Sequence, residues 1–452
     1  MCMSAPRPGL FRSSLLLLLL PLACGDAGTG GATEGGTGEL ETTDASATTS
    51  GGSTSAGPTS GAASSSSDAS GEATTDDATT DDPSATTTTT DGATDTDATT
   101  GEPLDPPEPP AYWTWLKIEI PGTVCGNGSQ YKFWVNWSDT SDNVALFFEP
   151  GGACWDYPGC NGETPLGAAN PDGLGDDHID LWSLHSPLIR RDDPGNPVAD
   201  WNLVFIPYCT GDVHTGNAAA TYADPDMQDP DLEYQHAGHN NMMAVTDWLD
   251  WRFPEIPEMF LTGCSAGGAG SLVNYYFLRS QLNVTGRGYL LNDSGPIFPS
   301  ELHSGPLHSK IRESWSLDSI LMLLPEFAEL QDDFGTINTL IADEFPEDRL
   351  AITYFIRDYN YSRYSYENFY DNLSKDDVHA LWWDDTQLLM DLYDGRDNLA
   401  YYLPYYRFFN DSHCSTLITY LGSEIPESDM TMGGFVDELF SDEPLMSYLG
   451  GP

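Results

Sequence analysis

A G-x-S-x-G motif occurs once, at residues 263–267, and its serine, Ser265, is the residue best suited to nucleophilic chemistry. A serine hydroxyl becomes an effective nucleophile when a tight turn lifts it toward a general base and a carbonyl group. The apolar run 259–261 predicts a buried strand before the motif, and residues 270–282 predict a helix after it. A plain glycine-rich turn is the alternative. The strand and helix on either side favour the catalytic interpretation.

A second glycine-rich segment, residues 149–154, directly follows the apolar strand predicted over 144–148. An acyl-transfer enzyme needs backbone N–H groups aimed at the oxyanion of its tetrahedral intermediate. One donor normally comes from the residue after the nucleophile, here Ala266, and another from a glycine-rich loop after an earlier strand. Gly152 and Ala153 are placed to supply it. A turn that only connects a strand to a helix is the competing interpretation.

A serine nucleophile also needs a histidine base and an acid that orients this histidine. Asp293 and Asp358 each follow a predicted strand, and both are candidates for the acid. Spacing alone does not choose among the four histidines that follow the serine, which are His303, His308, His379 and His413.

His236 and His239 form an H-x-x-H pair near the start of a predicted helix. Both rings could face one side of that helix, as a metal site would require. No third ligand is identifiable, so helix capping is the favoured interpretation. The sequence predicts neither a metal nor a cofactor.

The elements that must position these residues alternate between continuous apolar strands and amphipathic helices. Strands are predicted over residues 131–137, 144–148, 203–206, 259–261, 288–291 and 352–356, and a further helix over 240–251. Buried strands that alternate with helices predict an α/β fold with a mostly parallel sheet covered on both faces. Residues 301–350 and 361–406 are predicted to be mainly helical and to cap the sheet edge.

The first 110 residues differ in composition from the rest. Residues 1–24 have the shape of a signal peptide, and the segment around Cys24 resembles a bacterial lipobox, in which the cysteine is lipidated. Residues 25–110 are rich in Thr, Ser, Ala, Gly and Asp and lack Lys and Arg, so we expect a disordered acidic tether. Residues 111–452 are long enough for one domain with a full core.

The formal net charge of the chain is −53, which argues against nucleic acid and anionic membrane surfaces as partners. A membrane contact is expected only through a lipid on Cys24. Six cysteines remain after the predicted leader, and in an exported protein this even number suggests three disulfides. Cys154 and Cys160 flank a Pro-Gly turn, so we expect a local bridge between them. The other pairings stay open.

These motifs together resemble the pectin acetylesterase and Notum family. The resemblance rests on residues 263–268, on 201–211, on the 151–154 loop and on 412–414, and it covers most of the chain from Tyr112 onward. It implies an α/β-hydrolase-like fold, hydrolysis of O-acyl esters without a cofactor, and a triad in the chain order Ser, Asp, His. The family serine falls on Ser265, the aspartate on Asp358 and the histidine on His413. The oxyanion donors fall on Gly152, Ala153 and Ala266.

The sequence therefore predicts an exported serine carboxylesterase, secreted or anchored by lipid at the cell surface, which acts on O-acyl esters of small molecules or polysaccharides. O-acetyl esters are the expected type. Two rival interpretations remain, a catalytically inactive carbohydrate-binding protein and a serine peptidase on the same fold. Ser265 and His413 disfavour the inactive protein, and p-nitrophenyl acetate tested beside a peptide panel separates esterase from peptidase.

Overall fold

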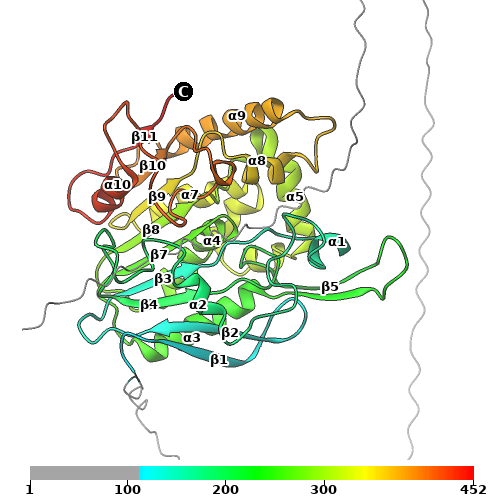
Figure 1. Ribbon diagram of the computed structural model, residues 1–452, viewed down its shortest axis with the longest axis horizontal. Coiled ribbons are helices and arrows are strands. Elements are labelled where there is room, and N and C mark those ends of the chain that lie inside the picture. The colour runs from blue at the N-terminus through cyan, green and yellow to red at the C-terminus, as the bar shows by residue number, and fades with distance from the viewer. Residues whose placement is uncertain (1–108, 110) are drawn as a thin grey trace, which may run out of the picture. The chain divides into compact units, whose positions relative to one another are not determined.

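The computed structural model describes Pro109 and residues 111–452, so the predicted leader, Cys24 and almost all of the tether lie outside the described residues. In the described residues, a nine-stranded sheet has the order β1-β2-β4-β3-β7-β8-β9-β10-β11 (Figure 1). Its strands are β1 (Trp115–Val124), β2 (Gln130–Asn136), β3 (Val144–Phe148), β4 (Asn202–Ile206), β7 (Met259–Cys264), β8 (Gly288–Asp293), β9 (Arg349–Thr353), β10 (Leu399–Leu403) and β11 (Tyr448–Leu449).

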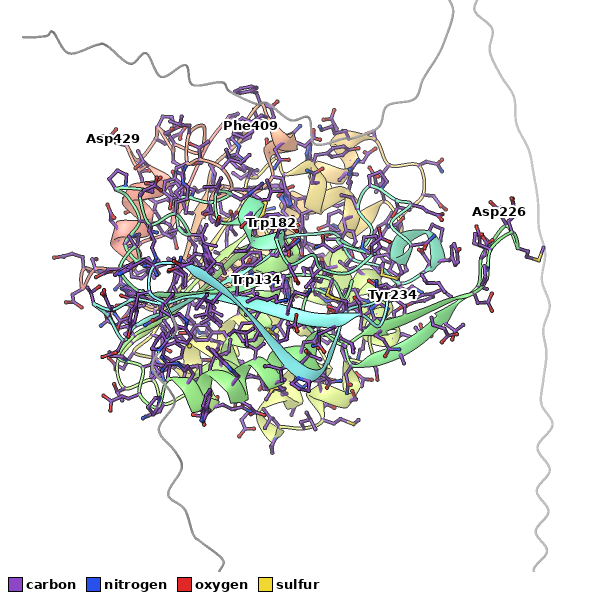
Figure 2. The ribbon with its side chains drawn as sticks, turned by 60° about the horizontal axis from the view of Figure 1, so that its bottom comes forward. Trp134, Trp182, Asp226, Tyr234, Phe409 and Asp429 are labelled. Atoms are coloured by element: carbon purple, nitrogen blue, oxygen red, sulfur yellow. A yellow bond between two sulfur atoms is a disulfide. The ribbon has the colours of Figure 1, made fainter. Side chains whose placement is uncertain are left out.

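The sheet is mostly parallel. β2 is antiparallel to its neighbours β1 and β4, whereas every other neighbouring pair, from β4-β3 to β10-β11, is parallel. The carboxyl ends of β3, β7, β8 and β9 therefore meet at one edge, and functional side chains of parallel sheets gather at such an edge. A separate hairpin, β5 (Ala218–Tyr222) with β6 (Leu232–His236), projects from the body, with Asp226 near its tip (Figure 2).

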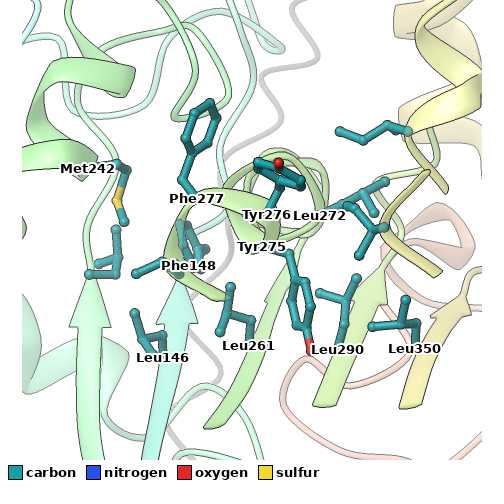
Figure 3. Close-up of a cluster of buried hydrophobic side chains, with 14 of the residues drawn as sticks. Leu146, Phe148, Met242, Leu261, Leu272, Tyr275, Tyr276, Phe277, Leu290 and Leu350 are labelled. Carbon is teal, nitrogen blue, oxygen red and sulfur yellow. The ribbon is translucent and has the colours of Figure 1, made fainter. Parts of the chain in front are cut away.

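Helices cover both faces of the sheet, as the continuous apolar strands predict. Alternate strand residues face opposite sides: Leu146 and Phe148 pack with α3 and α4, while Ala145 and Phe147 lie in the cluster that contains α2 and α10. The main helices are α2 (His178–Trp182), α3 (Gly238–Arg252), α4 (Ala266–Gln281), α7 (Ile337–Glu344), α8 (Tyr359–Tyr366), α9 (Lys375–Tyr393) and α10 (Met432–Leu439). Figure 3 shows the side chains of α4 packed against the leucines of β3, β7, β8 and β9.

A helical segment between β8 and β9 packs over α4. It comprises a π-helical turn η1 (Ser300–Ser304), α5 (Gly305–Ser314), α6 (Asp318–Leu321), two 3₁₀ turns η2 (Pro325–Gln331) and η3 (Phe334–Thr336), and α7. Trp315, Ile320 and Phe327 from this segment share the core cluster of α4. This segment supplies the predicted helical cap. The second stretch predicted as helical, 361–406, contains α8 and α9, but its end forms strand β10 and extends the sheet.

Three disulfides join the six cysteines in the described residues: Cys125–Cys209, Cys154–Cys160 and Cys264–Cys414. The Cys154–Cys160 bridge is local, and it closes the short helix α1 (Tyr157–Cys160). Bridges of this number are typical of proteins that fold under oxidising conditions. None of the helices in the described part of the chain is long and apolar enough to cross a membrane.

Candidate active site

Ser265 lies on a strained turn between β7 and α4. Its φ of 58° and ψ of −122° lie outside the regions that L-residues prefer, at a cost of about 1–3 kcal/mol. The turn is held because the N–H of Ser265 donates to the carbonyl of Asp293 at 2.8 Å. Gly267 is required by close packing, since a Cβ there would lie 2.1 Å from the carbonyl oxygen of Phe148. Strand, strained serine and helix form a nucleophile elbow at the carboxyl end of a central strand.

His413 and Asp358 form a hydrogen-bonded pair, in which His413 is partly exposed and Asp358 is buried. The Nδ1 of His413 lies 2.7 Å from Oδ2 of Asp358, whose side chain is fully buried. Asp358 is the N-cap of α8, and its Oδ1 accepts from the backbone N–H of Tyr361 at 3.0 Å. With Nδ1 bonded to a carboxylate, Nε2 is the ring nitrogen left to exchange a proton.

The pKa values of this pair reflect both burial and the contact between the two side chains. Burial alone lowers the pKa of His413, but the charge of Asp358 and its hydrogen bond outweigh this, so the pKa of His413 is raised above its ordinary value. Burial likewise raises the pKa of Asp358, although the charge of His413 and its hydrogen bond oppose the rise. The pair is thus suited to hold an imidazolium that forms during a proton transfer.

Asp293, the competing candidate for the acid, anchors the segment that follows His413. It is fully buried. Its two carboxylate oxygens accept from the N–H and hydroxyl groups of Ser415 and Thr416 at 2.7–3.0 Å, and Oδ1 also accepts from the hydroxyl of Ser294. With this full set of backbone and hydroxyl donors, Asp293 fixes the loop that follows β10 and carries His413, called the histidine loop below. The ring of His413 itself is bonded by Asp358.

A disulfide ties the serine turn to the histidine loop. Cys264 immediately precedes Ser265, Cys414 immediately follows His413, and their Cα atoms lie 5.7 Å apart across the bridge. Within the described residues no hydrogen bond joins the hydroxyl of Ser265 to His413. Such bonds are often long in ligand-free enzymes and tighten with substrate.

The predicted oxyanion donors differ in their availability. The N–H of Ala153 donates to the carbonyl of Leu166 at 3.1 Å, so this donor is already engaged, which the sequence could not reveal. Among the described residues, the N–H groups of Gly152 and Ala266 have no such partner. Gly152 allows the approach of the 166–167 backbone, because a Cβ at this position would lie 1.9 Å from the Leu166 oxygen.

The buried carboxylate of Glu149 holds the oxyanion loop (residues 149–154) in place. The sequence pattern gave this residue no role. Its Oε2 accepts from the N–H of Tyr208 and lies 2.8 Å from Nε2 of His178, and its Oε1 accepts from Asn170. The backbone carbonyl of Glu149 contacts the ring of buried His214 at 3.1 Å. The sequence signal for this role was a glutamate directly after an apolar strand. A carboxylate buried there needs hydrogen-bond donors around it.

An apolar cavity of about 100 Å³ lies beside the first turns of α4 and under the helical cap. Its walls come from α4, from the 296–337 segment and from α8, and they include Ala269, Phe277, Ile311, Phe327, Tyr361 and Tyr364. Ala269 is one helical turn beyond Ser265, and Tyr361 bonds the carboxylate of Asp358 through its backbone. The cavity therefore adjoins the elements that carry the candidate triad.

The two histidines of the H-x-x-H pair have structural surroundings. His236 contacts the hydroxyl of Tyr222 and the carbonyl of Thr210, and His239 packs edge-on against Phe277. Burial lowers the pKa of both to about 4. His308 lines the apolar cavity, and His303 lies 3.2 Å from Asp384. The two groups of potential metal ligands found in the described residues each contain a disulfide, Cys154–Cys160 or Cys264–Cys414.

The mixed, mostly parallel sheet and the serine elbow at its centre define the α/β-hydrolase class. The sequence model of the family described as Pectinacetylesterase matches residues 112–380, which is more than half of the chain, and the chain belongs to this family of carboxylesterases.

Two curated proteins of Arabidopsis thaliana are similar to part of the chain. Pectin acetylesterase 4 is 27% identical over 189 residues, which are 39% of this chain and 43% of that protein. Pectin acetylesterase 5 is 27% identical over 184 residues, or 38% and 40% of the two chains. The chain thus matches less than half the length of these relatives. The crystal structure of the Wnt deacylase Notum from Drosophila is 18% identical, with a TM-score of 0.47, and covers 74% of this chain and 97% of its own.

Proposed function

We propose that residues 111–452 form a serine carboxylesterase that works through an acyl-enzyme. Ser265 attacks the ester carbonyl, His413 accepts its proton and passes it to the leaving alcohol, and Asp358 stabilises the imidazolium. The N–H groups of Gly152 and Ala266 bind the oxyanion, and water then hydrolyses the acyl-enzyme. The observation that carries the proposal is the 2.7 Å bond between His413 and Asp358, on a loop tied by a disulfide to the strained Ser265 turn.

The substrates proposed are O-acetyl esters of polysaccharides. Support comes from the family to which the chain belongs and from the two plant relatives, which are named as pectin acetylesterases. We further propose that the protein is exported, because three disulfides suit an oxidising compartment and residues 1–24 resemble a leader. Lipidation of Cys24 would then anchor it, with the acidic segment 25–110 as a tether.

The first test replaces the nucleophile. Ser265→Ala should lower kcat for p-nitrophenyl acetate by on the order of 10⁶, because the nucleophile and its base act as a unit. The circular dichroism spectrum and the melting temperature should stay at the wild-type values, because the alanine removes no buried contact and the turn remains. A folded variant that keeps wild-type turnover contradicts the proposal. Cleavage of peptides in preference to the ester would assign the site to a peptidase.

Esters with longer acyl chains are a second candidate, favoured by the apolar cavity beside α4. Burying a methylene group contributes about 0.8 kcal/mol, so a chain that enters this cavity gains affinity with each carbon. A comparison of p-nitrophenyl acetate with the butyrate and octanoate esters separates the two candidates. A fall in kcat/KM from acetate to octanoate favours acetyl esters, and a steady rise favours the longer chains.

A further inference from the structure

A polar cleft of about 240 Å³ lies between the oxyanion loop and α8. One wall is formed by residues 153–166, which include the Cys154–Cys160 bridge, and the other by the outer face of α8 and the residues that follow it. Each wall continues an element of the candidate active site: Ala153 follows Gly152, and α8 begins at the cap Asp358. A group bound in this cleft would therefore lie beside the oxyanion loop, and α8 connects the opposite wall to the acid Asp358.

The cleft contains an arginine without an acidic partner. Within residues 111–452, where 53 acidic residues face 15 basic ones, Arg363 forms no ion pair, and its Nε is buried without a hydrogen-bond partner. Its aromatic contact is the ring of Tyr359, 5.6 Å away. A buried donor without a hydrogen-bond partner destabilises the folded state, so a ligand acceptor at this position would be favoured.

The other groups of the cleft combine acceptors, an amide and aromatic rings. Asp156 and Glu367 each accept one internal hydrogen bond, from the N–H of Gly159 and the hydroxyl of Tyr359, which leaves one carboxylate oxygen of each for a ligand. Asn368 adds donors and an acceptor, and Trp155 packs against Tyr364 in the wall. Donors and acceptors of both kinds next to aromatic rings match the hydroxyl groups and the apolar face of a sugar.

Tyr364 separates this cleft from the apolar cavity, because its side chain lines both. Its hydroxyl is buried without a partner at this boundary. The two halves of an ester also differ in polarity: the acyl half is apolar and the alcohol half is polar. The arrangement thus assigns the apolar cavity to the acyl side and the polar cleft to the alcohol side.

The charge of the molecule limits which alcohol fits. Residues 111–452 carry a formal net charge of −38 at pH 7. A strongly negative surface repels polyanions over a Debye length of about 8 Å at physiological ionic strength. Sugar chains that carry a carboxylate on every unit are therefore disfavoured, whereas neutral sugar chains are not.

We propose that this cleft binds the alcohol half of the ester and that this alcohol is a hydroxyl of a neutral glycosyl unit. The inference rests on the proposed esterase function. In the first step the bond from Ser265 Oγ to the acyl carbon forms, and the bond from that carbon to the sugar oxygen breaks. The serine proton passes through His413 to the sugar oxygen, so the neutral sugar leaves while the acyl group stays on the enzyme.

The experiment measures two substrates with one variant of the full chain. In Arg363→Ala, kcat/KM for an O-acetylated xylo-oligosaccharide should fall at least 10-fold more than kcat/KM for p-nitrophenyl acetate. Arg396→Ala is the matched control, because Arg396 forms a surface ion pair with Asp343 and does not line the cleft. It should leave the ratio of the two values unchanged. Equal losses on both substrates in Arg363→Ala would overturn the assignment. Asn368→Ala provides a second variant with the same expectation if Arg363→Ala does not fold.

Two further arms identify the ligand. At low salt, the wild-type protein should have a higher kcat/KM for the neutral oligosaccharide than for an O-acetylated oligogalacturonide. The reverse order, lost in Arg363→Ala, would show that the arginine binds a carboxylate instead. Calorimetric titration of Ser265→Ala with the neutral oligosaccharide reports the cleft without turnover, and adding Arg363→Ala should weaken binding at least 10-fold. Absence of ester hydrolysis by the wild type together with intact, Arg363-dependent binding would refute only the proposed function.

Discussion

At the scale of single residues, two buried aspartates near the histidine loop have different tasks. Asp358 bonds the ring of His413, whereas Asp293 accepts hydrogen bonds from the residues that follow it. One carboxylate orients a base, and the other fixes the backbone that carries it. Both lie close together in space, and substitution by asparagine, which preserves shape, tells them apart.

Asp358→Asn should lower kcat for p-nitrophenyl acetate by on the order of 10⁴ with little change in folding, because the histidine loses the partner that fixes its tautomer. Asp293→Asn should act mainly on stability, since it removes acceptors from the N–H and hydroxyl groups of Ser415 and Thr416. Thermal unfolding measured beside kcat separates the two effects. A folded Asp293→Asn that loses the activity which Asp358→Asn keeps would reverse the assignment.

The raised pKa of His413 predicts the pH dependence of the reaction. His413 must be neutral to accept the serine proton, so kcat/KM should rise with pH and reach half its maximum above pH 6.5, the ordinary histidine value. Asp358→Asn should move this limb of the residual activity to lower pH, because the charge that raises the pKa is gone. The folded state binds the proton of His413 more tightly than the unfolded chain does. The contribution of His413 to the free energy of unfolding is therefore complete below about pH 6.5. It is lost as the pH rises through the folded pKa. A limb below pH 6 in the wild type would contradict the pairing.

At the scale of elements, the site depends on connections that join distant parts of the chain. The β7–α4 turn and the loop after β10 are 150 residues apart along the sequence, and the Cys264–Cys414 bridge joins them. Cys125–Cys209 is similar in kind but lies away from the serine and histidine loops in the sequence. The chain therefore contains its own control for the effect of a bridge on catalysis.

Replacing both Cys264 and Cys414 with alanine should lower kcat about 10–100-fold, because a displacement of about 1 Å between serine and histidine suffices for such a loss. The Cys125→Ala/Cys209→Ala double variant should lower the melting temperature to a comparable degree with a smaller loss of kcat, because Cys209 adjoins the Tyr208–Glu149 contact of the oxyanion loop and not the serine or histidine loop. The measurement is kcat beside Tm for both variants. Equal kcat in both would mean that noncovalent contacts, such as those of Asp293, are sufficient to hold the loops.

Strongly apolar elements were predictable from the sequence, and long-range contacts were not. β3 has the predicted bounds, and β7 and α4 flank Ser265 as the motif requires, because local burial sets these elements. β10 was missed because its residues, L-A-Y-Y-L, lie in a stretch rich in helical signals and pair with β9 only after folding. Likewise, the engagement of the Ala153 N–H by Leu166 and the anchoring role of Asp293 depend on contacts between loops that no local pattern encodes.

At the scale of the whole molecule, residues 111–452 contain every group of the candidate site. A chain that begins near Tyr112 should keep its melting temperature and its kcat for p-nitrophenyl acetate within about twofold, because the segment 25–110 has too few apolar residues to join a core. Calorimetry and initial rates on the full chain and the shortened one provide the check. Loss of a cooperative transition on shortening would place the domain boundary earlier.

The nested order of two disulfides bears on how the chain would fold during the proposed export. Of the six bridged cysteines, Cys125 would emerge first and meet Cys154 before its native partner Cys209, whereas Cys154 and Cys160 are only 6 residues apart. Loop closure costs about 0.6 kcal/mol more for each doubling of loop length, so the small inner bridge closes ahead of a mismatched one. The Cys154–Cys160 bridge removes two competing thiols, so Cys125 stays unpaired until Cys209 emerges. We therefore expect sequential emergence to favour the native pairing of these four cysteines, with little need for a disulfide isomerase.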